Sequence, residues 1–151
     1  MKYLFSFIMA ALLNVSSYAA QSEYLLNITK DDVIIHNQND WHFVTKSDKH
    51  DIYIERGMVG TKQEIVTFHA FVSYEEPQDF YGIDKPISAL YVYGSLHCGR
   101  QQLMMLMDLY VDANNKIASR RPYEPNSFIV SLNVPHTTRF DILNLVCKES
   151  I

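Results

Sequence analysis

The chain has 151 residues, 48% of them hydrophobic, and 17 acidic against 13 basic side chains give it a formal net charge of −4. This length fits one domain, and a mildly acidic chain without a basic run argues against nucleic acids and anionic membrane surfaces as partners. Its ten tyrosines, eight phenylalanines and one tryptophan favour strands and contact surfaces.

Residues 1–19 have the layout of a secretory signal peptide. Lys2 gives a positive start, an apolar run follows, and small side chains at Ser17 and Ala19 predict cleavage after Ala19. A membrane anchor is the alternative, but the run is shorter than the roughly 20 residues that span a bilayer. No cysteine follows the run to carry a lipid anchor. We therefore expect an exported protein, located in the periplasm, at the cell surface or outside the cell, with no membrane span in its mature form.

Residues 20–40 are expected to form an N-terminal arm whose order the pattern leaves open, and residues 41–151 a single domain. Within that domain the hydrophobic period is mostly two, which is typical of strands. Strands are predicted at 41–45, 51–55, 63–74, 88–98, 101–111, 117–120 and 128–132. Residues 75–86 contain two prolines and a glycine and are predicted to be a loop. Gly94 lies within a strand and indicates a bulge or a close crossing.

The alternation also predicts which side chains of the three long strands share a face. The expected core positions are Val66, Phe68, Ala70, Val72 and Tyr74, then Leu90, Val92, Leu96 and Cys98, and finally Leu103, Met105, Met107, Leu109 and Val111 on one face of the third strand. The opposite face would then carry the remaining residues of these strands.

The period changes to a helical one near the C-terminus. Thr138 is predicted as the N-cap, and Asp141 three residues later resembles a capping box. A broad apolar arc then extends to Cys147, which indicates a helix that packs on the sheet. The predicted fold class is α+β, with a curved antiparallel sheet of about six strands and this helix on one face.

Cys98 and Cys147 are the only cysteines in the chain. In an exported protein the default expectation for such a pair is a disulfide, and two buried free thiols are the alternative. The strand pattern and the helix pattern turn both side chains toward the same core. The predicted bond therefore joins the helix to the sheet.

Several short motifs occur in an order that resembles the surface-adhesin protein E family of Gram-negative bacteria: Trp41-His42-Phe43-Val44, Tyr53-Ile54-Glu55, Tyr74 before Pro77-Gln78, Ser88-Ala89-Leu90-Tyr91 before Cys98, and a helix that ends at Cys147. The resemblance covers roughly residues 41–148. It implies an antiparallel sheet with a disulfide-linked C-terminal helix, dimerisation, and binding of host matrix and serum proteins such as vitronectin, laminin and plasminogen. The chain departs from the family at Glu55, where aspartate is usual, and at His69, where tryptophan is expected. No ligand contact of the family maps onto a motif here.

We predict no catalytic, cofactor-binding or metal site. Serines of the predicted strands lack a glycine elbow, and there is no glycine-rich phosphate loop. His69 and His97 are expected on the non-core faces of two long strands and could share a metal if the register brought them together, although hydrogen-bonded or solvent-facing histidines are the alternative. Met105 and Met107 offer thioether ligands for copper(I), but their pattern places them among core leucines.

The predicted interaction face is aromatic and lies on or near the sheet face opposite the helix. It comprises Phe71, Phe80, Tyr81, Tyr91 and Tyr93. Clustered exposed rings mark interfaces, and the alternative is that a loop or the segment 21–39 covers them. The leading hypothesis is an exported, non-enzymatic protein-binding module that uses this face for a partner or a homodimer. A periplasmic accessory or enzyme-inhibitor protein, and a carrier that binds a small ligand on the concave sheet face, are the alternatives.

Overall fold

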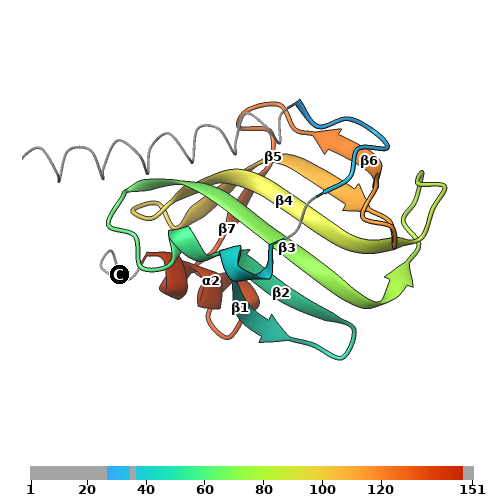
Figure 1. Ribbon diagram of the computed structural model, residues 1–151. Coiled ribbons are helices and arrows are strands. Elements are labelled where there is room, and N and C mark those ends of the chain that lie inside the picture. Colours follow the sequence, from blue (N-terminus) through green and yellow to red (C-terminus); the bar gives the residue numbers. More distant parts are fainter. Residues whose placement is uncertain (1–26, 35–36, 148–151) are drawn as a thin grey trace, which may run out of the picture.

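The computed structural model describes residues 27–34 and 37–147, in which seven strands form one antiparallel sheet that curls into a half-barrel (Figure 1). Strands β1 to β6 are neighbours in chain order, and β7 pairs with β5 beyond the end of β6. The elements are η1 (Gln38–Asp40), β1 (Trp41–Lys46), β2 (His50–Glu55), η2 (Arg56–Met58), β3 (Ile65–Gln78), β4 (Ile87–His97), β5 (Gln102–Val111), β6 (Ile117–Pro122), β7 (Ile129–Ser131) and α2 (Thr138–Val146). The predicted α+β fold with a curved antiparallel sheet is confirmed.

The predicted signal peptide and its cleavage site lie outside the described residues. Among the residues that the structure describes, no helix is long and apolar enough to cross a membrane. Residues 27–34 lie beside the start of β6, and the domain boundary at residue 41 stays a prediction.

Strand β3 is longer than predicted. It continues through residues 75–78, where a loop was expected, and Gln78 pairs with Ile87 of β4. The pairing is irregular between Ser73 and Gln78, so Pro77 lies where no regular ladder requires its missing N–H group. The loop to β4 is therefore shorter than predicted and spans residues 79–86.

A β-bulge interrupts the pairing of β4 with β5. Tyr93 pairs with Met107 and Gly94 pairs with Met105, which leaves Leu106 as an extra residue in β5. A β-carbon on Gly94 would come within 2.5 Å of a main-chain oxygen of β5. Both features predicted at Gly94, a bulge and a close approach of two backbones, are confirmed.

The bulge reverses the two faces of β5 along its length. The prediction that five alternate residues of this strand share one face is therefore wrong. Leu103 and Met105 pack in the core beneath α2, whereas Met107, Leu109 and Val111 pack in a separate cluster on the other face. One extra residue shifts the side-chain alternation by one position, so every later side chain changes face.

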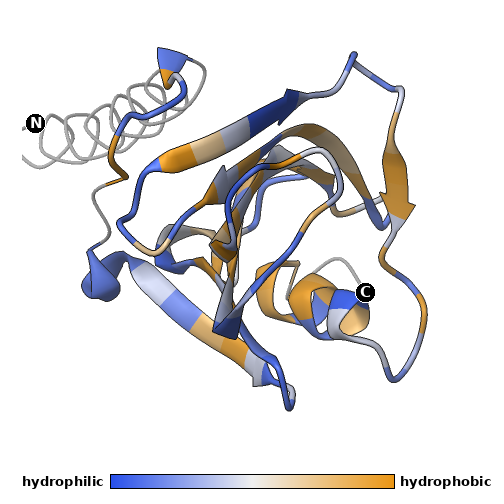
Figure 2. Ribbon diagram, turned by 90° about the vertical axis from the view of Figure 1, so that its right-hand side faces the viewer, coloured by the Kyte–Doolittle hydropathy of each residue, from blue (hydrophilic) through white to orange (hydrophobic). Residues whose placement is uncertain are grey.

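Helix α2 lies within the curl of the sheet (Figure 2) and buries Ile142, Leu143 and Val146 against it. Its N-cap is Thr137, whose hydroxyl oxygen accepts the N–H of Phe140 at 3.3 Å, so the predicted cap at Thr138 is wrong by one residue. The capping-box prediction fails with it, because the third residue after Thr137 has no side-chain acceptor.

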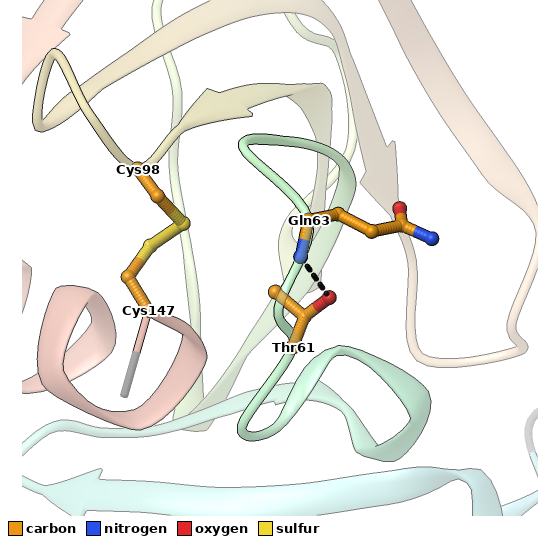
Figure 3. Close-up of a disulfide and its surroundings, with 4 residues drawn as sticks. All are labelled: Thr61, Gln63, Cys98 and Cys147. Carbon is orange, nitrogen blue, oxygen red and sulfur yellow. Dashed lines mark hydrogen bonds between the residues drawn. A yellow bond between two sulfur atoms is a disulfide. The ribbon is translucent and has the colours of Figure 1, made fainter. Parts of the chain in front are cut away.

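The disulfide between Cys98 and Cys147 joins the end of β4 to the end of α2 (Figure 3). The two Cα atoms are 5.5 Å apart, and both residues are fully buried. The N–H of Cys98 also donates to the carbonyl oxygen of Glu64 at 2.8 Å, which ties the β4 end to the segment before β3. The predicted bond between helix and sheet is confirmed, and it fits an exported protein.

Candidate interaction face

Four aromatic side chains pair in register across β1 to β4 on the sheet face opposite α2. Phe43 pairs with Tyr53, Tyr53 with Phe71, and Phe71 with Tyr91. Successive ring centroids are 5.6, 4.5 and 5.4 Å apart, and the last two pairs are stacked. We call these four residues the aromatic ladder. Cross-strand aromatic pairs of this kind each contribute about 0.2–1 kcal/mol to sheet stability.

Trp41, at the start of β1, packs against the middle of the aromatic ladder. Its ring lies edge-on to Phe71 with centroids 4.7 Å apart, and 6.0 Å from the ring of Tyr91. The guanidinium of Arg56 donates to the carbonyl oxygens of Asn39 at 2.9 Å and Trp41 at 3.0 Å. These bonds fix the position where the chain enters β1, and with it the position of the indole ring.

A shallow hollow lies beside this entry. It has a volume of about 400 Å³ and is lined by Asn39, Asp40, Glu55, Arg56 and Gly57. Its one basic side chain, Arg56, already donates to main-chain oxygens, whereas Asp40 and Glu55 make the lining acidic.

The aromatic ladder is buried at its centre and open at its β1 end. Phe71 is 6% exposed, whereas Phe43 at the sheet edge is 50% exposed. Burial raises the pKa of Tyr91 to about 12, so its hydroxyl remains protonated at physiological pH. The most exposed residue of the ladder is the apolar Phe43, which lies on the edge strand β1.

Two ion pairs of Lys46 border the open end of the ladder. The Lys46 ammonium lies 3.0 Å from a carboxylate oxygen of Glu75 and 3.8 Å from one of Asp51. The hydrogen bond that Lys46 donates to Glu75, followed by the charges of Asp51 and Glu75, raises the pKa of Lys46. These three side chains give the apolar ladder a polar rim.

The structure brings together three of the five residues predicted to form the interaction face. Phe71, Tyr91 and Tyr93 share the face opposite α2. Phe80 instead packs against a tyrosine of β3 and a tyrosine of β5, at centroid distances of 5.9 and 5.2 Å. Tyr81 is fully exposed at 102% on the loop between β3 and β4. The predicted interaction face lacks Phe43 and Tyr53, although both occupy alternate positions in predicted strands.

The segment 27–34 covers part of the same face. Ile28 and Ile34 are buried in a cluster that also contacts Tyr91 and Tyr93. An N-terminal segment therefore covers the aromatic face at the β5–β6 end, as the alternative prediction expected. At the β1 end, half of the Phe43 side chain remains exposed.

His69 is a buried hydrogen-bonded residue next to the ladder. Its Nδ1 atom lies 2.8 Å from a carboxylate oxygen of Glu55, and its ring centroid lies 4.9 Å from that of Tyr93. His97 pairs with Ile65, whereas His69 pairs with Tyr93, so the register keeps the two histidines apart. Within the described part of the chain, no group of three or more potential metal ligands occurs.

No protein-family model matches the chain, and no curated protein matches it. Solved structures of Haemophilus influenzae protein E do match it. One crystal form gives a TM-score of 0.55 at 17% identity over 82% of this chain and 98% of protein E. The chain has the protein E fold. A second structure of protein E gives a TM-score of 0.53 at 16% identity, over 81% of this chain and 94% of that one.

Protein E from non-typeable Haemophilus influenzae gives a TM-score of 0.52 at 17% identity, over 80% of this chain and 83% of that one. All three comparisons therefore span most of both chains at low identity. They establish a shared protein E architecture, as the resemblance in the sequence implied.

Proposed function

We propose that this chain is an exported, non-enzymatic protein-binding module of the adhesin E type, and that partners bind at the β1 end of the aromatic ladder. The observation that carries this proposal is the in-register ladder that ends in a half-exposed Phe43 at the sheet edge. The shared protein E fold supports it.

The ladder is suited to binding because its rings are already ordered. Tyr53 stacks on the buried Phe71, and Phe43 packs on Tyr53, so little side-chain entropy is lost when a partner covers them. Aromatic side chains are also enriched among the residues that dominate interface energies.

The partners we propose are host matrix or serum proteins such as vitronectin, laminin and plasminogen. We also propose a homodimer through the same face. Cell fractionation separates this proposal from a periplasmic role. Surface exposure of the protein supports adhesion, and strictly periplasmic protein contradicts it.

The direct test is Phe43→Ala, measured as binding to immobilised vitronectin and laminin. We expect at least tenfold weaker binding, which corresponds to about 1.4 kcal/mol. Phe128→Ala is the matched control, because Phe128 is 48% exposed but lies before β7, away from the ladder. Equal affinities for the wild type and Phe43→Ala would contradict the proposed site. Light scattering of the same proteins tests the homodimer.

An enzyme-inhibitor module is the second candidate, and one observation favours it. Residues 80–83 form a β-turn in which the N–H of Ile83 donates to the carbonyl oxygen of Phe80 at 3.1 Å, and Gly82 has a φ of 79°. This turn holds Tyr81 fully exposed at its first central position while Phe80 anchors it. If inhibition is the function, Tyr81→Ala should abolish it while matrix binding by the ladder is unchanged.

A further inference from the structure

Helix α2 covers only part of the sheet face that curls around it. Val72 of β3 pairs with Leu90 of β4 on this face, and both side chains are partly exposed and lie outside the cluster beneath α2. Three aromatic rings border them. The Phe80 ring lies 5.9 Å from that of Tyr74 and 5.2 Å from that of Tyr110, measured between centroids. The concave face therefore keeps a partly open apolar area beside an aromatic wall.

A buried carboxylate lies next to this area. Asp108 of β5 is two positions before Tyr110 on the same face, and it is 6% exposed. The hydroxyl of Tyr123 donates to its Oδ2 atom at 2.7 Å, whereas its Oδ1 atom is buried and has no hydrogen-bond partner among the described residues. Buried polar atoms without a partner are rare in native proteins, and a bound group is one explanation for them.

The opposite charge lies on the neighbouring strand. Arg121 of β6 pairs directly with Asp108, but its guanidinium lies over the Tyr110 ring, 5.5 Å from the centroid. Burial raises the pKa of Asp108, and Arg121 opposes that shift only through its charge, whereas Tyr123 opposes it by a hydrogen bond. The face thus presents a carboxylate and a guanidinium side by side, with no hydrogen bond joining them.

We propose that this part of the concave face binds a free α-amino acid with an aromatic side chain. The ammonium group of the ligand donates to Oδ1 of Asp108, and its carboxylate pairs with the Arg121 guanidinium, which suits carboxylates geometrically. The ring of the ligand lies on Val72 and Leu90, beside the aromatic wall.

The charges of the site select a zwitterion. Arg121 repels an amine that lacks a carboxylate, and Asp108 repels an acid that lacks an ammonium group, whereas an amino acid satisfies both. Because Oδ1 is buried in the free domain, binding includes a rotamer change at Asp108 or Arg121, and exposed side chains such as Arg121 change rotamer within nanoseconds. The site lies on the face opposite the aromatic ladder and does not depend on the function proposed there.

The test is isothermal titration calorimetry of the full chain with three matched probes. L-Phenylalanine carries both charges, phenethylamine lacks the carboxylate, and hydrocinnamate lacks the ammonium group. We expect L-phenylalanine to bind at least tenfold more tightly than either of the other two. Absence of saturable binding by L-phenylalanine would overturn the site, and equal affinity for phenethylamine or hydrocinnamate would overturn the zwitterion as its ligand.

Two variants each remove one charge of the site. Asp108→Asn and Arg121→Gln should each weaken the binding of L-phenylalanine at least tenfold, and wild-type affinity in either variant would overturn the proposal. Asp141→Asn is the matched control, because Asp141 is an exposed acid on α2, and it should bind like the wild type. The asparagine amide still accepts the Tyr123 hydroxyl, so the melting temperature of Asp108→Asn should not fall. Arg121→Gln changes an exposed side chain and tests the site even if Asp108→Asn does not fold.

Nuclear magnetic resonance locates the bound amino acid. Addition of L-phenylalanine should shift the amide signals of Leu90, Asp108 and Arg121 and leave those of Phe43 and Tyr53 unchanged, whereas shifts confined to the ladder would overturn the concave site. Phe43→Ala should leave the affinity for L-phenylalanine unchanged, so failure of the ladder proposal and failure of the amino-acid site are distinguishable.

Discussion

The disulfide between Cys98 and Cys147 should supply a large share of the stability of this domain. The two residues are separated by 49 positions in the sequence, and closing a loop of that length in the unfolded chain corresponds to about 4 kcal/mol at 25 °C in the chain-entropy model. Domains of this size have total stabilities of about 5–15 kcal/mol. Reduction should therefore leave a folded but much weaker domain.

The measurement is urea unfolding of the wild type with and without reductant. This comparison keeps both buried sulfur atoms in the chain, whereas alanine substitutions would add cavities to the effect of losing the cross-link. We expect a loss of about 4 kcal/mol and a fall in melting temperature of roughly 15 °C. The slope of the unfolding free energy with urea should increase, because a reduced unfolded chain exposes more surface.

Two results would refute this reasoning. The first is a pair of reactive thiols in protein denatured without reductant, which would mean that no bond forms. The second is a loss of less than about 1 kcal/mol on reduction, which would mean that helix packing alone holds α2 on the sheet and that the entropic estimate does not apply.

Three other changes test particular contacts. Gly94→Ala should destabilise the domain by at least about 2 kcal/mol in urea unfolding, because the new β-carbon would lie 2.5 Å from a main-chain oxygen. Gly99→Ala is the control and should change the stability little, because its β-carbon would meet only the end of a flexible side chain at 3.4 Å. His69→Leu should cost about 1–3 kcal/mol because it leaves the buried Glu55 carboxylate without its hydrogen bond, and adding Glu55→Gln should recover part of that loss. The pKa of Asp112 in the folded protein lies below its ordinary value of 3.8, so the stabilisation by the ionised carboxylate is present above pH 3.8 and is lost as the pH falls through the folded pKa. The difference in unfolding free energy between the wild type and Asp112→Asn, measured across an acid titration, should therefore vanish below the folded pKa. A difference that stays constant with pH would contradict this prediction.

The sequence predicted the strands well where alternation was interrupted by a distinctive residue. Gly94 indicated the close approach of β4 to β5 because only a residue without a β-carbon fits there. The extra residue itself, Leu106, has no such signature. It lies in a run of apolar residues, so skipping one position leaves a pattern that still looks regular.

Asp108 shows the consequence of the bulge at Leu106, which the hydrophobic alternation did not predict. The uninterrupted pattern places it on the polar face of its strand, but the bulge turns it to the side of α2, where it is 6% exposed. Burial raises the pKa of Asp108, and the hydroxyl of Tyr123 donates to its carboxylate at 2.7 Å. A buried acid thus follows from one extra residue two positions earlier, which single-sequence alternation cannot detect.

The helix start was misplaced for a different reason. Thr137 and Thr138 are adjacent and chemically alike, so side-chain type cannot decide which one caps the helix. The extended backbone at Thr137, with φ −119° and ψ 155°, decides it. Backbone geometry of this kind depends on how the preceding loop leaves the sheet, which is a tertiary property.

The bulge also determines where recognition can occur. Without the bulge, the alternate apolar residues of β5 would all lie beneath α2, and the opposite face of the sheet would be polar beyond the ladder. Because Met107, Leu109 and Val111 turn outward, that face must bury them, and the segment 27–34 does so at the β6 edge. Among the four residues of the aromatic ladder, Phe43 on the other edge is the most exposed. The aromatic edge at Phe43 and the apolar row covered by residues 27–34 are therefore separate regions of one face.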